Sequence, residues 1–172
     1  MAGSNLVYYW DTCVFLAWIK NEVSRKPGEM DGVREVINRL NKRQLSIMTS
    51  VLTITEISAS KLPAGSDDLF EQVLQRPNVS KVSVDIKIAR LARELRNYYI
   101  TKNGVDGLTL TVPDSLHLAT AILYKPIEFH TFDERDNPKI KALGLLPLSG
   151  DVAGHNLTIC KPMAQQAGFP GI

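Results

Sequence analysis

Apolar residues recur along the chain with two different spacings, one typical of strands and one typical of helices. Short β-rich runs predict strands at residues 6–10, 45–49, 79–84, 127–131 and 156–160. Apolar residues with helical spacing fill the intervals and predict helices at 12–20, 29–43, 53–61, 67–76, 86–100, 114–124 and 136–143. Strands that alternate with helices favour a mostly parallel central sheet, so we expect an α/β fold, a three-layer α/β/α sandwich.

Two of the predicted helices differ in how their apolar residues are arranged. The helix at 114–124 is apolar around its whole axis, which predicts that it is buried. The helix at 86–100 has one apolar face, and the rest of its surface carries Lys87, Arg90, Arg93 and Arg96. A solvated helix face explains such a basic surface, and a contact with the phosphate backbone of RNA is the functional alternative.

Length and composition limit the domain organisation. The 172 residues suit one domain, which we place at 1–160, with residues 161–172 as a C-terminal tail. A content of 44% hydrophobic and 22% charged residues predicts a folded globular protein. The longest apolar run, at 13–19, is far shorter than the roughly 20 residues of a membrane span. No export signal precedes the fold, so we expect a cytoplasmic protein without a membrane segment.

Net charge and cysteines add little to this picture. A net charge of +2 does not by itself indicate nucleic acid, so any site for a polyanion must be local. Cys13 and Cys160 are isolated thiols, and we expect both to pack as small apolar residues.

Four acidic residues stand at comparable places, next to the junctions of predicted strands and helices. They are Asp11, Glu56, Asp114 and Asp133. Capping of a helix N-terminus explains each acid taken singly, and Thr53 and Glu56 match the capping-box pattern. In an open parallel sheet, however, the strand-to-helix junctions emerge at one edge, where ligands bind, so we expect the four acids to converge.

Converging carboxylates also predict a cofactor. They repel one another, and a dry cleft retains them mainly when a cation offsets their charge. Ligands that are all oxygen atoms favour Mg²⁺ (or Mn²⁺) over zinc, and no His or Cys has the spacing of a zinc site.

The segments around the four acids carry a family resemblance. They read VYYWDT at residues 7–12, SVLTITEI at 50–57, PDSLHLATA at 113–121 and HTFD at 130–133. In order and spacing they resemble the PIN-domain ribonucleases, and within them the VapC-like toxins of type II toxin–antitoxin systems. The buried helix of those toxins typically reads Asp-x-x-x-x-Ala-x-Ala, and their last strand ends in Thr-x-Asp. The resemblance covers roughly residues 5–160.

The resemblance implies a metal-dependent endoribonuclease that hydrolyses phosphodiester bonds in single-stranded RNA. It implies that the catalytic, metal-binding acids are Asp11, Glu56, Asp114 and Asp133, with Asp136 as a fifth candidate. Thr12 and Thr131 are implied as hydroxyls that bond the acids or the scissile phosphate, and we expect Arg90, Arg93 and Arg96 to contact RNA. The partners implied are an RNA substrate and an antitoxin that fills the acidic cleft; we also expect a homodimer.

Several alternatives stay open at this point. A loop at 101–112 and the tail after Lys161 depart from a compact toxin, which keeps a housekeeping RNA-processing nuclease as an alternative. A non-catalytic PIN-like scaffold that binds RNA or protein is a second, although none of the four acids is lost. His117 lies one helical turn after Asp114 and is expected either to pack in the core or to contact an acid or the substrate. His130 and His155 have no Ser or Cys partner in a recognisable motif, so no hydrolase triad is predicted.

Overall fold

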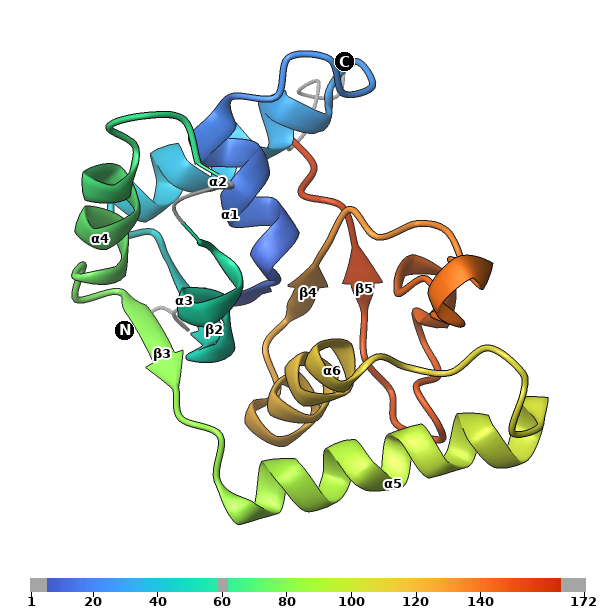
Figure 1. Cartoon of the computed structure of the whole chain (residues 1–172). Coiled ribbons are helices and arrows are strands. Elements are labelled where there is room, and N and C mark those ends of the chain that lie inside the picture. The colour runs from blue at the N-terminus through green and yellow to red at the C-terminus, as the bar shows by residue number, and fades with distance from the viewer. Residues whose placement is uncertain (1–5, 59–61, 165–172) are drawn as a thin grey trace, which may run out of the picture.

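The computed structural model describes residues 6–58 and 62–164, and a five-stranded parallel sheet forms its centre (Figure 1). The strands are β1 (Leu6–Trp10), β2 (Leu45–Ser50), β3 (Val79–Val82), β4 (Glu128–His130) and β5 (Ile159–Cys160). Within the described ranges the α-helices are α1 (Thr12–Lys20), α2 (Glu29–Asn41), α3 (Leu52–Glu56), α4 (Asp67–Leu74), α5 (Ile86–Asn103) and α6 (Val112–Tyr124). Two 3₁₀ helices follow β4, η2 (Pro138–Ile140) and η3 (Leu146–Leu148).

Side-chain alternation along β1 separates two hydrophobic cores, one on each face of the sheet. Tyr8 and Trp10 enter the core formed with α1, α2 and α4, whereas Tyr9 enters the core formed with α5 and α6. The Tyr9 ring stacks on that of Phe129 in β4, with centroids 4.9 Å apart and planes 9° apart. In Figure 1, α5 and α6 lie together on one side of the strands. The predicted three-layer α/β sandwich is confirmed.

The strand order places one edge of the sheet where a ligand is expected. The order is β3-β2-β1-β4-β5, so the chain leaves β1 toward β2 and β3 on one side and toward β4 and β5 on the other. In open parallel sheets, ligands bind outside the carboxyl ends of the strands at the point where the order reverses. Here that point lies between β1 and β4, which are paired through Tyr9 with Phe129 and Trp10 with His130.

Helix α6 begins two residues before the predicted start because Asp114 does not cap it. The cap is Thr111, whose Oγ1 accepts the Asp114 N–H at 3.2 Å, and Pro113 stands in the first turn. The Asp114 carboxylate is therefore not used as the helix cap. The prediction of complete burial is wrong for the last turn, where Leu123 and Tyr124 are exposed.

The predicted helix at 136–143 is wrong. Only η2 forms there, because Asn137 and Ala142 bond each other through their backbones at 2.7 and 3.0 Å instead of continuing a helix. The predicted strand at 156–160 is reduced to the two residues of β5. The helix predicted at 53–61 ends at Glu56, and residues 59–61 lie outside the described residues. Helix α5 extends to Asn103, which shortens the loop predicted at 101–112.

The described part of the predicted tail packs against the domain. Lys161 Nζ lies 2.6 Å from Glu29 Oε1 on α2 and 2.8 Å from Glu134 Oε2. A Cβ atom added to Gly32 of α2 would lie 2.0 Å from the carbonyl oxygen of Pro162, so only glycine admits this approach. Residues 165–172 of the predicted tail lie outside the described residues. No helix in the ranges 6–58 and 62–164 combines the length and apolarity that crossing a membrane requires.

Candidate active site

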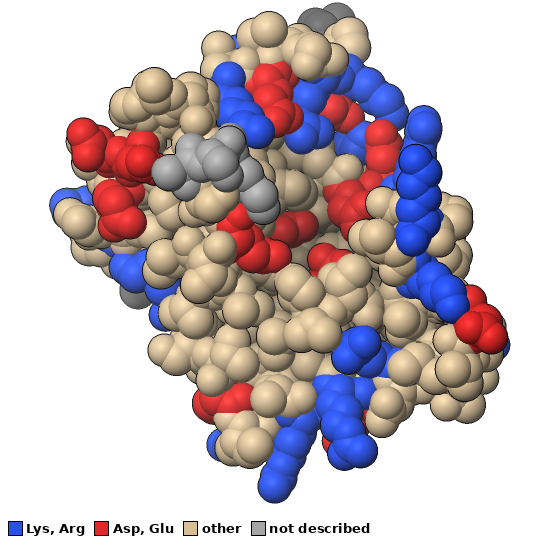
Figure 2. Space-filling view, viewed as in Figure 1, with Lys and Arg blue, Asp and Glu red and all other residues tan. Residues whose placement is uncertain are grey.

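The four predicted acids stand on separate elements at the carboxyl edge of the sheet. Asp11 directly follows β1 and caps α1, Glu56 is the last residue of α3, Asp114 lies in the first turn of α6, and Asp133 follows β4. Figure 2 shows acidic side chains gathered in a hollow in the middle of one face of the molecule, with lysine and arginine side chains farther out.

Electrostatic coupling shows that the structure brings these acids together. Burial, together with the negative charges of Asp114 and Asp11, raises the pKa of Asp133 to about 6. Burial likewise raises the pKa of Asp114, to which the charges of Asp11 and Glu56 add, although a hydrogen bond from Thr111 opposes the shift. Asp11 therefore acts on both Asp114 and Asp133, and Glu56 acts on Asp114, so negative charge is concentrated in this cluster.

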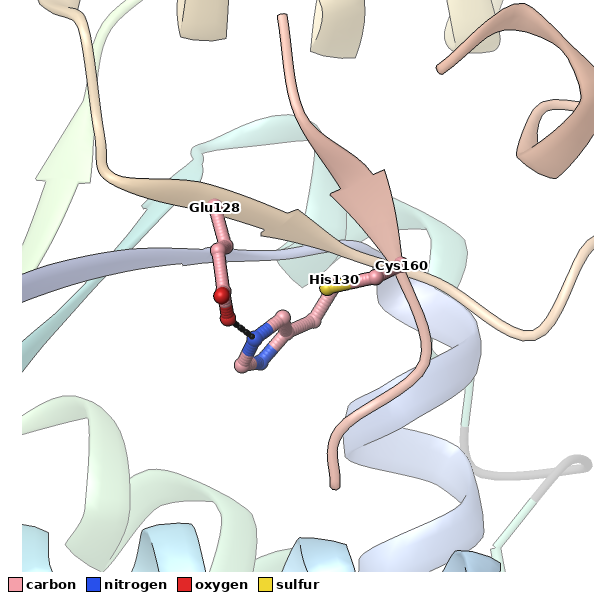
Figure 3. A group of neighbouring side chains, drawn as sticks. All are labelled: Glu128, His130 and Cys160. Atoms are coloured by element: carbon pink, nitrogen blue, oxygen red, sulfur yellow. Dashed lines mark hydrogen bonds and ion pairs between the residues drawn. The ribbon is translucent and has the colours of Figure 1, made fainter. Parts of the chain in front are cut away.

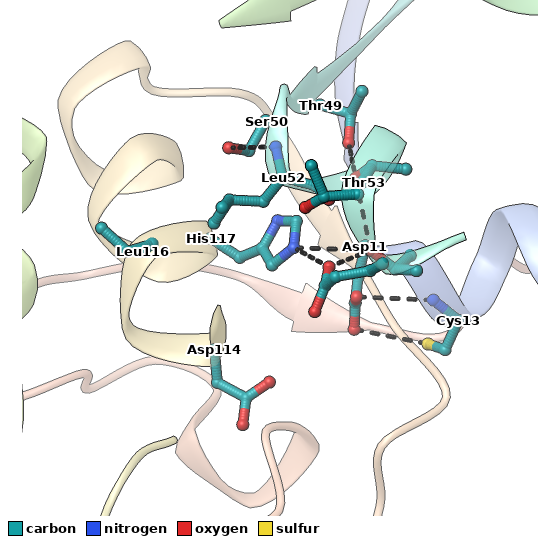
Figure 4. Close-up of polar contacts among 12 residues, drawn as sticks. Asp11, Cys13, Thr49, Ser50, Leu52, Thr53, Asp114, Leu116 and His117 are labelled. Carbon is teal, nitrogen blue, oxygen red and sulfur yellow. Dashed lines mark hydrogen bonds and ion pairs between the residues drawn. The ribbon is translucent and has the colours of Figure 1, made fainter. Parts of the chain in front are cut away.

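Asp11 is held by hydroxyl, thiol and backbone groups. Thr131 Oγ1 donates to Asp11 Oδ2 at 2.7 Å, and the backbone N–H of Cys13 donates to Oδ1 at 3.4 Å. Cys13 Sγ lies 3.3 Å from Asp11 Oδ2, and burial, together with the charge of Asp11, raises the pKa of Cys13 far above its usual value. The thiol therefore stays protonated and donates to the carboxylate (Figure 4). Thr131 Oγ1 also accepts the N–H of Asp133 at 3.1 Å, which links two of the acids.

The capping box predicted for Thr53 and Glu56 is absent from the structure. Helix α3 begins at Leu52 after Val51, and the Thr53 hydroxyl lies 2.7 Å from that of Thr49 and 3.3 Å from that of Thr12. Glu56 Oε2 instead accepts a hydrogen bond from Thr12 Oγ1 of α1, at 2.5 Å. The interpretation of Glu56 as a cap is therefore wrong, and Thr12 does bond one of the acids as implied by the resemblance.

His117 is the second partner of Glu56. The ring, which Figure 4 shows, is buried. Its Nε2 lies 2.8 Å from Glu56 Oε2, and its Nδ1 lies 2.7 Å from the Tyr9 hydroxyl. Burial opposes the charged ring, but the hydrogen bond to Glu56 and the charges of Asp11, Glu56 and Asp114 outweigh it, so the pKa of His117 is raised. Of the two predictions for His117, contact with an acid is confirmed.

Asp136, the fifth candidate, bonds the backbone of its own loop. Its Oδ1 accepts the backbone N–H of Gly144 at 2.9 Å, which fixes the loop between Asp133 and η3. Its charge adds only the last of the contributions that raise the pKa of Asp133. The hydrogen bond to Gly144 gives Asp136 a structural role in this loop.

Known proteins share this arrangement of elements. A family profile described as PIN domain matches residues 8–141, which include the four acids. The chain belongs to the PIN domain family. None of the curated proteins matches the sequence.

Two solved structures resemble the PIN domain described above. A chain of a VapBC2 structure from Rickettsia felis, bound to a DNA fragment from its promoter, is 17% identical with a TM-score of 0.57, covering 90% of this chain and 98% of that one. A chain of a toxin–antitoxin complex from Klebsiella pneumoniae is 19% identical with a TM-score of 0.53, covering 90% and 97%. At these identities the likeness concerns the fold.

The basic residues predicted to contact RNA have mixed environments. Arg90 and Arg93 are exposed on α5, which carries none of the four acids. Arg96 is half-buried, and its Nε donates to the carbonyl of Leu110 at 3.1 Å, so it supports the segment that leads into α6. No contact with RNA follows from these positions alone.

A second group of potential ligands lies elsewhere, at the paired strands β4 and β5. Within the described residues, Glu128, His130 and Cys160 place three ligand atoms within 4.8 Å of one another (Figure 3). The Trp10 indole N–H donates to His130 Nδ1 at 3.1 Å, so the ring hydrogen lies on Nε2, which donates to Glu128 Oε2 at 2.8 Å.

This hydrogen bonding disfavours a zinc site at the second group. A histidine that binds a metal through Nε2 donates its Nδ1–H to an acceptor, and an indole N–H accepts nothing. Burial and the charge of Glu128 also raise the pKa of Cys160 to about 12, so in the metal-free protein the thiol is protonated and hydrogen-bonded to Glu128. The group is therefore a hydrogen-bonded cluster. The sequence spacing does not indicate this group, because Cys160 meets the other two residues only through the pairing of β4 with β5.

Sequence patterns missed two residues that contact the site. Cys13 was expected to pack as a small apolar residue, yet it contacts Asp11, and Tyr9 was assigned only to a strand, yet its hydroxyl bonds His117. Strand alternation could have indicated the second contact. It separates Tyr9 from Tyr8 and Trp10 and directs it toward the face that α6 covers.

Proposed function

We propose that this PIN-domain protein is a metal-dependent endoribonuclease that hydrolyses single-stranded RNA in the cytoplasm and acts as the toxin of a toxin–antitoxin pair. The observation that carries the proposal is the meeting of Asp11, Glu56, Asp114 and Asp133, from separate elements, at the carboxyl edge where the strand order reverses. Simple helix capping does not explain the set, because only Asp11 caps a helix.

The residues present fit a hard divalent cation. Their candidate ligands are carboxylate oxygens, and the raised pKa values of Asp114 and Asp133 reflect negative charge that a cation would neutralise. Mg²⁺ or Mn²⁺ would be held by these four acids, and when bound it supplies water activation and neutralises the charge of the leaving oxygen.

The chain's own groups orient the acids for this task. Thr131 and the Cys13 N–H fix the Asp11 carboxylate, Thr12 and His117 fix Glu56, and Thr111 bonds Asp114. A ligand that is already held in place loses less conformational freedom when a cation binds. The site is thus preorganised for a cation and a phosphodiester rather than for a nucleophilic side chain.

Single-stranded RNA is proposed as the substrate because of the family resemblance and the exposed arginine side chains on α5. Arg90 and Arg93 are available to contact phosphates, and Tyr98 on the same helix is 42% exposed, with Lys102 Nζ 5.8 Å from its ring centroid. An exposed aromatic ring offers a stacking surface for an unpaired base. These residues define the surface to mutate if cleavage is found.

An antitoxin partner is supported by the two solved neighbours, whose titles describe VapBC2 and a toxin–antitoxin complex. A small antitoxin-like reading frame beside the gene, whose product copurifies with this chain and inhibits cleavage, would support the toxin assignment. A housekeeping nuclease would lack such an inhibitor. The homodimer expected from the sequence stays a prediction, and sedimentation of the purified chain tests it.

The deciding experiment measures cleavage of labelled single-stranded RNA with Mg²⁺ or Mn²⁺, in wild type and in Asp114→Asn. Glu128→Gln is the matched control, because Glu128 is an acid bonded to a buried histidine outside the acid cluster. We expect cleavage by wild type and by Glu128→Gln, and none by Asp114→Asn or in excess chelator. Full activity in chelator, or in Asp114→Asn, would overturn the proposal.

A further inference from the structure

Glu56 differs from the three aspartates in how much freedom its side chain has. It ends a five-residue helix, its longer side chain has one more rotatable bond than an aspartate, and the side chain is 26% exposed. Such a carboxylate gains a fixed position only through partners outside its own helix. Thr12 on α1 and His117 on α6 are such partners, and both contact the same oxygen, Oε2.

His117 is itself fixed from the core side. Its side chain is 2% exposed, and the Tyr9 hydroxyl at Nδ1 comes from the central strand β1. Tyr9 is fully buried, stacks on Phe129 and meets the His117 ring edge-on, with centroids 5.8 Å apart. A continuous path therefore runs from the sheet through Tyr9 and His117 to the Glu56 carboxylate.

The helix that holds His117 also carries one of the acids. Asp114 and His117 are three residues apart on α6, and residues with this spacing lie on the same face of a helix. One rigid element thus supplies the Asp114 carboxylate and the group that bonds Glu56, which stands 61 residues away in sequence. His117 thus links the position of the Glu56 carboxylate directly to the helix that carries Asp114.

We propose that His117 is a positioning residue, which holds Glu56 in register with Asp114 so that both carboxylates can bind one cation. The proposal rests on the proposed function, because it concerns the same acids. It differs from a purely structural role, in which His117 and Tyr9 only satisfy each other in the core. The two roles predict different Mn²⁺ affinities for a variant in which both polar groups are removed together.

The test is the double variant Tyr9→Phe/His117→Leu. Removing both partners of a buried hydrogen bond leaves no unpaired group between them, so the double variant is expected to fold. The matched control is Trp10→Phe/His130→Leu, which removes the equivalent donor and ring from the His130–Glu128 pair. A third variant, His117→Gln, keeps an amide donor for Glu56 and serves as the rescue.

The readouts are Mn²⁺ affinity, measured by electron paramagnetic resonance of free Mn²⁺, and RNA cleavage. Loss of a group that orients a ligand typically weakens metal affinity roughly 10- to 100-fold, which we expect for Tyr9→Phe/His117→Leu even when its melting temperature in the absence of metal matches wild type. The control pair should keep wild-type affinity, and His117→Gln should recover most of it.

The outcomes distinguish this proposal from the proposed function. Wild-type Mn²⁺ affinity in Tyr9→Phe/His117→Leu would overturn the role of His117 and leave the metal site intact. An equal loss of affinity in the control Trp10→Phe/His130→Leu would also overturn it, because the effect would then be one of general stability. A wild-type chain that binds no Mn²⁺ would overturn the proposed function and this role together.

Discussion

His117 and His130 are both buried, and each places Nε2 2.8 Å from a glutamate oxygen. The difference lies at Nδ1, where His117 meets the Tyr9 hydroxyl and His130 meets the Trp10 indole. Tyr9 and Trp10 are neighbours on β1, and alternation sends them to opposite faces of the sheet. A hydroxyl donates or accepts, whereas an indole only donates, so only His130 has its tautomer fixed by its neighbour.

The two glutamates also have opposite electrostatic surroundings. The hydrogen bond from His130 lowers the pKa of Glu128, so this pair is balanced within itself. Glu56 instead faces Asp11 and Asp114, and around them burial and mutual repulsion raise the pKa values of Asp114 and Asp133. A histidine–glutamate pair is thus a structural contact at His130 and part of a negatively charged cluster at His117. Neighbouring charge decides which of the two can attract a cation.

The largest effect is expected for Asp11→Asn. Asparagine caps a helix nearly as well as aspartate, so α1 should persist, and removing one crowded charge should leave the metal-free stability unchanged or slightly higher. RNA cleavage should fall by more than the roughly 100-fold that follows loss of a ligand's partner. Cleavage assays and thermal melts of the same preparation check this, and wild-type activity would show that Asp11 is only a cap.

A smaller effect is expected for Glu56→Gln, compared directly with Glu128→Gln. A neutral amide oxygen is a weaker ligand for a hard cation, so Glu56→Gln should lower Mn²⁺ affinity at least about 10-fold. Glu128→Gln should leave Mn²⁺ affinity unchanged, because Glu128 bonds His130 and Cys160 in the second cluster. The increase in melting temperature at saturating Mn²⁺ reports the Mn²⁺ affinity of each variant. Equal Mn²⁺ stabilisation in the two variants would erase the contrast between the two pairs.

The pH dependence of stability should have opposite signs in the two regions. The folded pKa of Asp133, about 6, exceeds its ordinary value of 3.8, so its contribution to metal-free stability is present below about 3.8 and is lost as the pH rises through 6. Glu128, whose pKa is lowered, contributes stability above its ordinary 4.5 that is lost as the pH falls.

Denaturant unfolding of Asp133→Asn and Glu128→Gln between pH 3 and pH 7 checks these signs. Relative to wild type, Asp133→Asn should gain stability as the pH rises through 6, whereas Glu128→Gln should lose stability as the pH rises toward 4.5 and stay level above it. Parallel curves for the two variants would contradict the account. In wild type, Mn²⁺ affinity should increase up to about pH 6, because the cation requires the ionised Asp133.

The smallest effect is expected for Cys160→Ala. If the Glu128, His130 and Cys160 group is a hydrogen-bonded cluster, the variant should lose at most about 1 kcal/mol of stability. Melting shifts with Zn²⁺ and with Mn²⁺ should match those of wild type. A Zn²⁺ stabilisation that disappears in Cys160→Ala would show that the Trp10 donor does not prevent metal binding there.

Local patterns predicted most of the fold. The run at 6–10 is apolar at every position and forms β1 with those bounds, because its successive side chains enter the cores on opposite faces of the sheet. The helix predicted at 136–143 failed because the backbone of Asn137 and Ala142 pairs across the loop, a contact that helical spacing does not encode. The start of α6 was misplaced because Asp114 and Thr111 are both good caps, and Pro113 can stand either in the first turn after Thr111 or just before a cap at Asp114.

The acids of the site were predictable because strand topology brings their junctions to one edge. Their supporting contacts were not, since His117 reaches Glu56 over 61 residues and Tyr9 over 108. Such distances are set by the packing of α6 on the sheet, which no local pattern fixes. For the same reason the second cluster, between β4 and β5, was not predicted.

The measurement that tests the central claim most directly is Mn²⁺ binding by wild type and Asp114→Asn at pH 7.5, followed by calorimetry. This pH lies above the pKa of about 6 of Asp133, so wild type should bind Mn²⁺ without releasing a proton from Asp133. Asp114→Asn should bind much more weakly while melting no lower in the absence of metal, because it relieves repulsion in the cluster. Equal Mn²⁺ binding by the two proteins would contradict the account and show that the four acids do not form the metal site.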